Sequence, residues 1–206
     1  MTETSRQTRA PQTRASALPA DERRNAIAEA TLPLLLDVGA AVTSRQIAEA
    51  AGIAEGTIFR VFDTKEDVIW AAVELGFDSS PTARSIAGID RSLPLRRRLV
   101  EAVGYIQERT AIVVRLMGVA AAVSPDRRGP TPPGKPRGDV DELVELFRPD
   151  ADALRCEPHI AAQILRSITF GGTHELFLTD DGPLSPEQIV DFALVGVAKR
   201  PTPPTR

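Results

Sequence analysis

The stretch that decides the fold is residues 43–65, TSRQIAEAAGIAEGTIFRVFDTK. Thr43 is a residue type that caps helix N-termini, and the spacing behind it predicts a helix over residues 44–51. Gly52 then stands where the chain must turn sharply at positive φ, a conformation that glycine adopts readily. A second short helix is expected over residues 55–61. Two helices joined in this way are typical of a DNA-reading helix-turn-helix.

The apolar residues of this stretch predict how the two helices pack. Ala48 is small at the point where the helices cross, so the two backbones can approach closely. A plain helical hairpin reproduces the apolar spacing, but rarely the combination of Ala48, Gly52 and Ile58 with a polar face. The residues expected to face inward are Ile47, Ala51, Ile53, Ile58 and Val61. Those left facing outward, where they can enter a major groove, are Arg45, Glu55, Gly56, Thr57, Phe59 and Arg60.

Composition excludes several classes of protein. The 206 residues are 42% hydrophobic, which is ordinary for a globular chain of one or two domains. No run of about 18 apolar residues is present, and the N-terminus lacks a signal-peptide pattern, so a cytoplasmic protein without a membrane span is expected. One cysteine excludes an internal disulfide and a cysteine-based zinc site. With two histidines and no catalytic motif, no enzyme, metal or cofactor is expected.

Net charge argues against a generally basic DNA-binding surface. The whole chain carries −3, and residues 1–76 hold eight basic against eleven acidic side chains. Attraction to phosphate must therefore be local. We expect Arg45, Arg60 and Lys65 to share one face. The N-terminal arm is a second positive source, with Arg6, Arg9 and Arg14 against Glu3, although an inert solvated tail accounts for it equally well.

The periodicity along the chain predicts an all-α protein without strands or repeats. The domains expected are a disordered arm (1–20), a helix-turn-helix DNA-binding domain (21–76), a regulatory and dimerisation domain (77–200) that includes a mobile loop (124–138), and a disordered tail (201–206).

Within these domains the pattern predicts particular elements. They are a first helix from Asp21 to Gly39 that bends at Pro33, a loosely structured connection over 77–90, two helices or a kinked pair over 92–123, and helices over 139–148, 158–179 and 186–198. The run Arg96, Arg97 and Arg98 is expected to be a solvated helix face rather than a binding site.

The chain resembles the TetR family of one-component transcriptional repressors. The resemblance covers residues 23–73, including AEATLPLLLDVG and TSRQIAEAAGIAEGTIFRVFDTKEDVIWAAV. A weaker one, in QILRSITFGGTH (residues 163–174), is to members of actinobacterial type. The resemblance implies an N-terminal domain that binds double-stranded DNA, a C-terminal domain that binds a small-molecule effector and dimerises, and release from the operator when the effector binds.

The same resemblance implies roles for individual residues. Thr43 and Ser44 match phosphate-contacting positions, and Arg45 matches a position that reaches base edges. Glu55, Gly56 and Thr57 open the recognition helix and face the groove. Lys65 matches a lysine that clamps phosphate. Two departures remove possible phosphate donors, since Phe59 stands where the family usually has tyrosine and Val61 where histidine is common. Arg60 is expected to offset part of that loss.

The resemblance leaves the regulatory half less defined. The helices over 158–198 are expected to form a four-helix bundle with a second copy, which places the recognition helices ~34–36 Å apart. Gly171-Gly172 either permits close approach across that dimer or marks a kink. Candidate effector contacts are Tyr105, Arg109, Met117, Phe147, Phe170 and His174. Met117 and Phe170 fit a plain core better, and Tyr105 and His174 are the better candidates because a buried polar group needs a partner. The alternative function is a DNA-binding regulator without an inducer, controlled by a protein partner or acting as an activator.

Overall fold

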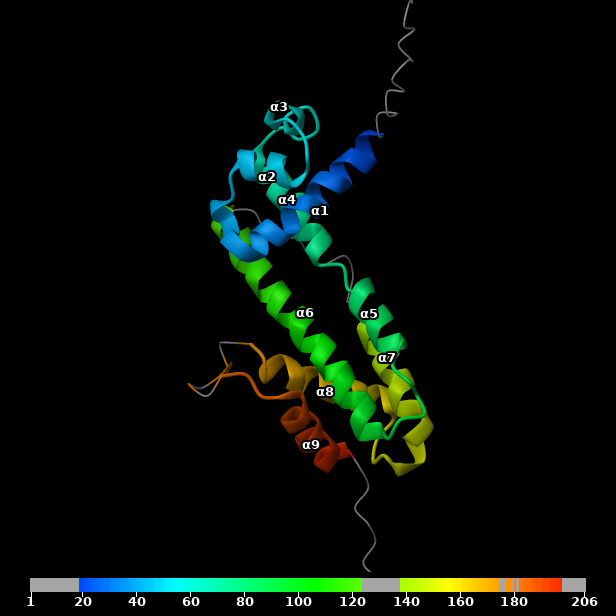
Figure 1. The fold of residues 1–206 in the computed structure, drawn as a ribbon. Helices are drawn as coiled ribbons and strands as arrows, with labels where there is room; N and C mark the ends of the chain where they lie inside the picture. The colour runs from blue at the N-terminus through cyan, green and yellow to red at the C-terminus, as the bar shows by residue number, and fades with distance from the viewer. Residues whose placement is uncertain (1–18, 124–137, 175–176, 179, 181, 198–206) are drawn as a thin grey trace, which may run out of the picture.

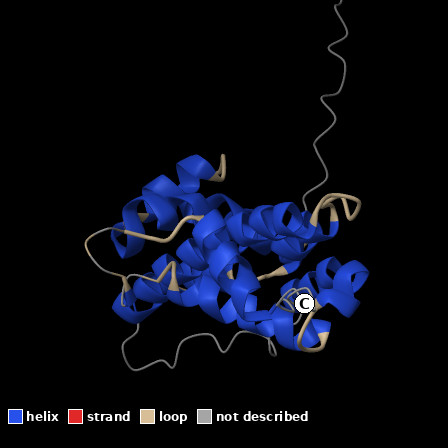
Figure 2. Cartoon of the chain, turned by 90° about the horizontal axis from the view of Figure 1, so that it is seen from below, coloured by secondary structure: helices blue, strands red, loops and turns tan. Residues whose placement is uncertain are grey.

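The protein folds into helices over the residues that the computed structural model describes, 19–123, 138–174, 177–178, 180 and 182–197. Figure 2 shows these segments as helix and connecting loop. The sequence therefore predicted the all-α class correctly. The arm over 1–18, nearly all of the 124–138 loop and the tail over 201–206 lie outside the described residues. In the described part, no helix is long and apolar enough to cross a membrane.

The first helix runs where the sequence placed it. Helix α1 spans Ala20–Val38 and a 3₁₀ turn, η1, covers Gly39–Ala41. Gly39 has φ 66°, a left-handed conformation that ends the helix. Pro33 lies inside α1 without ending it. Helix α1 packs on α4, Lys65–Gly76, and these two helices support the motif between them (Figure 1).

The motif forms as its turn residues dictate. Helix α2 spans Ser44–Ala50, Gly52 follows at φ 64°, and α3 covers Glu55–Ile58. The regular helix is thus shorter than expected, because residues 59–61 continue as turns in which N–H groups bond three residues back. Ile47, Ala48 and Ile58 are buried as predicted, while Ala51, Ile53 and Val61 are partly buried against the same core.

Two expectations between residues 77 and 123 were wrong. The supposed loose connection contains helix α5, Ser80–Ala87, which Ile86 anchors in the core. The supposed pair of helices is one continuous helix, α6, Leu95–Val123, of 29 residues and roughly 44 Å. It begins just after Pro94, and the described residues of α6 carry an apolar stripe along their whole length, which removes any reason for a break.

The last described helices form the far end of the molecule. Helix α7 spans Gly138–Phe147, a 3₁₀ segment η2 spans Arg148–Ala153, α8 spans Pro158–Gly171 and α9 spans Pro186–Val197. Helix α8 is shorter than the expected 158–179. It ends at Gly172, where an added Cβ would lie 3.2 Å from Leu184 and 3.3 Å from Ile189. Gly172 therefore permits close packing within one chain, at the end of a helix.

Arg98 corrects the interpretation of the arginine run. Its side chain is only 3% exposed, and it pairs with Asp150 on η2 while donating to the carbonyl of Arg91 at 2.6 Å. Arg96 and Arg97 do lie at the surface, paired with Asp191 and Glu101. Arg96 and Arg97 are therefore solvated as expected, whereas Arg98 is buried. A buried cation is tolerated only where a carboxylate and hydrogen bonds compensate its lost hydration.

Two hydrophobic cores lie at opposite ends of α6. One core joins α1–α4 to the last turns of α6, through Leu116, Val119 and Ala120. The other joins the first turns of α6 to α5, α7, α8 and α9. A single long helix therefore links the helix-turn-helix to the rest of the chain (Figure 1).

Candidate nucleic-acid interface and ligand cavity

The N-terminus of α2 is fixed by a reciprocal cap. The Thr43 hydroxyl accepts from the backbone N–H of Gln46 at 3.2 Å, and the Gln46 side chain accepts from the backbone N–H of Thr43 at 2.9 Å. This arrangement satisfies two helix-end donors and holds the first turn rigidly. Arg45, on that turn, is exposed. A rigid first turn with an outward guanidinium is suited to reading base edges.

The face of α3 is open along most of its length. Glu55, Gly56 and Arg60 are exposed, and Phe59 exposes 48% of its surface. Thr57 is half-buried, so it is less free than expected. The buried residues Ile58 and Phe62 fix this face on the core beneath it. Sequence reasoning missed Phe62, whose ring also lies 4.3 Å from the Arg24 guanidinium on α1.

Lys65 ties the start of α4 to the start of α2. Its Nζ donates to the Val42 carbonyl at 3.3 Å, next to the Thr43 cap. Thr64, just before it, caps α4 by the same reciprocal pattern with Asp67. A positive charge thus lies beside the N-terminus of α2, near Thr43 and half-buried Ser44. Helix N-termini and cations both favour a phosphate.

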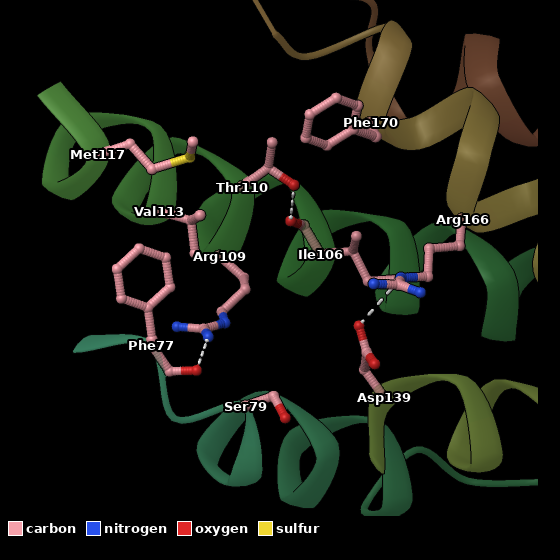
Figure 3. A pocket seen from close by; sticks show the side chains of 10 residues that line it. All are labelled: Phe77, Ser79, Ile106, Arg109, Thr110, Val113, Met117, Asp139, Arg166 and Phe170. Atoms are coloured by element: carbon pink, nitrogen blue, oxygen red, sulfur yellow. Dashed lines mark hydrogen bonds and ion pairs between the residues drawn. The ribbon is translucent and has the colours of Figure 1, made fainter. Parts of the chain in front are cut away.

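A cavity of about 200 Å³ lies against the middle of α6, between the two cores (Figure 3). Helix α6 gives one wall, the α4–α5 connection and α7 give the base, and α8 closes a side. Its lining residues are Phe77, Ser79, Ile106, Arg109, Thr110, Val113, Met117, Asp139, Arg166 and Phe170. Most of this lining is apolar, with charged groups from three elements, as in many small-molecule sites.

The charged groups of the cavity differ in their partners. Arg166 on α8 pairs with buried Asp139 on α7, with 3.4 Å between Nε and Oδ2. Arg109 on α6 donates to the carbonyls of Gly76 and Phe77, at the end of α4 (Figure 3 draws the bond to Phe77). Burial lowers the pKa of Arg109, and the charges of Asp139 and Asp78 oppose that shift.

Comparison with known proteins decides what the N-terminal helices are. Residues 27–72, which contain α2, α3 and most of α4, match the family described as bacterial regulatory proteins, tetR family. The chain carries a TetR-family DNA-binding domain. Helices α2, α3 and α4 are therefore the helix-turn-helix DNA-binding domain of a transcriptional regulator. No curated protein shows a significant sequence match.

Solved structures share this fold over most of the chain. A TetR transcriptional regulator from Streptomyces coelicolor is 21% identical, with a TM-score of 0.54 over 85% of this chain and 98% of its own. A protein from Mesorhizobium loti assigned to the TetR family is 16% identical, with a TM-score of 0.54 over 89% and 100%. The multidrug-binding protein EbrR, complexed with imidazole, is 20% identical, with a TM-score of 0.51 over 87% and 97%. Fold likeness to proteins from such different bacteria does not narrow the chain to one bacterial type.

The six effector contacts predicted from the sequence lie in different parts of the structure. Arg109, Met117 and Phe170 line the cavity, the latter two at its exposed rim. Tyr105 lies in a different groove, between α1, α4 and α5, and His174 in another near Arg115. Phe147 is 1% exposed and belongs to the core. The structure thus does not bring all six together.

Sequence reasoning missed the remaining cavity residues, Asp139 and Arg166 above all. Each is a charged residue on an amphipathic helix, but the two are 27 positions apart and no short sequence pattern indicates that they pair. They meet because α7 packs across α8. Helix crossing of this kind leaves no short-range pattern in a single sequence, so only their charge could have marked them.

Proposed function

We propose that this protein is a repressor that binds a pseudo-palindromic operator as a homodimer and leaves it when a small molecule enters the α6 cavity. One observation carries the proposal. Helix α4 contributes Lys65 beside the start of α2 at one end, and at its other end accepts the hydrogen bonds of Arg109 from the cavity wall. A change at the cavity can therefore reach the DNA-binding face through one 12-residue helix.

The operator contacts that we propose lie on α2, α3 and the start of α4. Arg45 reads base edges, and Thr57 contacts phosphate or base. Thr43, Ser44, Arg60 and Lys65 contact phosphate, while Glu55, Gly56 and Phe59 line the groove. In this scheme residues 21–76 are the DNA-binding domain and residues 77–200 the regulatory domain.

The second copy docks on the helices of residues 158–198. Exposed apolar side chains on α8 and α9 support this: Phe192 and Val195 expose 75% and 76% of their surfaces, and Ile160 and Ile164 each 38%. Such large apolar residues at the surface favour association with another chain. Two-fold pairing then places both recognition helices on one side of the duplex.

The cavity favours ligand release over control by a protein partner. A site of about 200 Å³ with an apolar lining and a few charged groups suits a small molecule. EbrR, which shares the fold, is a multidrug-binding protein whose structure contains imidazole. Assignment to the actinobacterial type remains part of the proposal and rests on residues 163–174 alone.

Selection of genomic fragments by the purified protein tests the proposal. We expect one class of fragment with a repeated, inverted half-site, and release by at least one small-molecule class. Arg45→Ala and Thr57→Ala should reduce specific affinity, the former by ~1–3 kcal/mol per half-site, with fold and dimer intact. Arg97→Ala, a surface arginine on α6, is the matched control and should bind normally. Enrichment of random fragments by the unaltered protein would contradict the repressor function.

A further inference from the structure

Arg109 stands where the cavity meets the DNA-binding half of the molecule. It projects from the middle of α6 to the last turn of α4, where it donates to two successive carbonyls, those of Gly76 and Phe77. These groups belong to a helix end, which lacks partners within the helix for its last carbonyls. The guanidinium therefore acts as the cap of α4.

The partners of Arg109 are neutral. Among the described residues, no carboxylate lies within 4.0 Å of its guanidinium, whereas Arg166 in the same cavity has Asp139 at 3.4 Å. A guanidinium and a carboxylate carry opposite charges and can form two parallel hydrogen bonds, whereas a guanidinium and a carbonyl share only the charge of the donor. A carboxylate that entered the cavity would therefore be a better partner for Arg109 than the carbonyls are.

The rest of the lining fits the other end of such a molecule. Ile106, Val113 and Phe77 make the walls around Arg109 apolar, and Met117 and Phe170 form a rim. Asp139 pairs with Arg166, so Arg109 is the charged residue of the described lining that has no carboxylate within 4.0 Å, and Asp139 and Asp78 act on it only from farther away. The lining therefore favours a compact ligand with a single negative charge and an apolar tail.

We propose that the α6 cavity binds an amphipathic monoanion, a carboxylate on a short apolar chain, and that this carboxylate draws Arg109 away from the end of α4. The loss of the cap frees the last turn of α4 from α6. Because α4 also holds Lys65 against the start of α2, the DNA-binding face responds. The anion site is inferred from the cavity contacts alone. Only the response of the DNA-binding face rests on the proposed repressor function.

The burial of Arg109 also favours a negatively charged ligand. Arg109 is half-buried, and burial lowers its pKa. Partial loss of water therefore destabilises the charged form of the guanidinium. An anion in contact with it would offset that destabilisation, and a cation would add to it. A neutral molecule of equal size would gain only the apolar contacts.

Three molecules with one tail and different charges provide the test: octanoate, 1-octanol and octylammonium, each titrated into the full-length protein by calorimetry. Trp70, the single tryptophan, lies buried in α4 and reports on that helix by fluorescence. We expect octanoate to bind about tenfold or more tightly than the other two and to change the Trp70 emission. Octanoate affinity weaker than ~1 mM, or equal affinity for all three, overturns the proposal.

Two variants of α6 locate the anion. Arg109→Gln removes the charge and should weaken octanoate about tenfold or more. Arg115→Gln is the matched control, because Arg115 donates to the Leu36 carbonyl of α1 at 2.8 Å but does not line this cavity. It should bind octanoate normally. If Arg109→Gln does not fold, Arg109→Lys, which keeps the charge, should retain a preference for octanoate over octanol. Undiminished binding by Arg109→Gln, or binding without any Trp70 change, would contradict the inference.

Operator binding measured alongside separates the two proposals. Octanoate should release the wild-type protein from selected fragments and leave Arg115→Gln equally sensitive. If fragments are bound and a neutral or cationic compound releases them while octanoate does not bind, the anion site fails and the repressor stands. If octanoate binds through Arg109 but the protein selects no fragments, the repressor fails and the anion site stands.

Discussion

Phe59 is the residue of the proposed DNA-binding face at which one added atom should change affinity for the operator. Its ring is half exposed on the surface of α3, beside exposed Arg60. In the proposed interface this ring would pack on a sugar or a thymine methyl, but a phenylalanine offers no donor to a phosphate oxygen. The backbone around it is fixed by buried Ile58 and Phe62, so a donor added at the ring edge would be held in position.

Phe59→Tyr should therefore tighten operator binding. One neutral hydrogen bond to phosphate is worth about 0.5–1.5 kcal/mol, which is a few-fold in affinity. Because a neutral hydroxyl releases no counterion, the slope of affinity against salt should not change. Fluorescence anisotropy with a labelled operator across a salt series measures both quantities. Phe59→Leu, which adds no hydrogen-bond donor at the same position, is the control and should show no gain in affinity. Wild-type affinity in Phe59→Tyr would mean that Phe59 lies away from any phosphate.

At the scale of elements, α4 is held at its end as firmly as at its start. Gly76 is buried, and a Cβ added there would lie 2.2 Å from Leu116 on α6 and 2.9 Å from Leu32 on α1. The absence of a side chain therefore lets three helices meet at one point. That contact also brings the Gly76 carbonyl to Arg109.

Gly76→Ala should destabilise the fold by about 1–3 kcal/mol, because Leu116 is fully buried and the added methyl overpacks the junction. Gly118→Ala is the control on α6, where an added Cβ meets nothing within 4 Å. That change should raise stability by about 0.5–1 kcal/mol, as alanine does in a helix interior. Chemical denaturation of both variants measures the difference. Equal midpoints would show that the junction is loosely packed.

The elements also show what a single sequence can predict. Thr43 caps its helix through its own hydroxyl, and Gly39 and Gly52 turn the chain at positive φ, so their roles followed from residue type and immediate neighbours. The extent of α6 did not, because the pattern over residues 92–123 fits one helix or two, and packing into a core at each end decides between them. Arg98 was misjudged for a similar reason. Its carboxylate partner, Asp150, lies 52 positions away and is brought close by η2.

The same limit applies to the two candidate sites. The DNA-binding face is formed by neighbours in sequence, so a short pattern could outline it. The cavity is lined by residues from the end of α4, the start of α5, α6, α7 and α8. Of the six effector contacts predicted from the sequence, Arg109, Met117 and Phe170 line it. The sequence also did not show which apolar residues of α8 and α9 face outward. Phe192 and Val195 are exposed, whereas Ile168 and Leu194 pack against the core of their own chain.

For the whole molecule, we expect two copies to associate through those exposed side chains. Val195→Lys should yield monomers or aggregates, because a lysine placed within an apolar interface loses hydration without gaining a partner. Val38→Lys makes the same change on α1, where the valine is 40% exposed, and should leave the dimer intact. Light scattering after size-exclusion chromatography reads the mass of each. A dimer from Val195→Lys would place the interface away from α9.

The sharing of α6 between both cores has a consequence for modularity. The helix-turn-helix half cannot be cut out as an independent piece at residue 76, because Leu116, Val119 and Ala120 fill its core from outside that segment. A chimaera that grafts this DNA-binding half onto another regulator must include the last turns of α6, because α1 and α4 pack against them. Such a graft would also carry Met117, on the same turns of α6, and with it part of the wall of the proposed effector cavity.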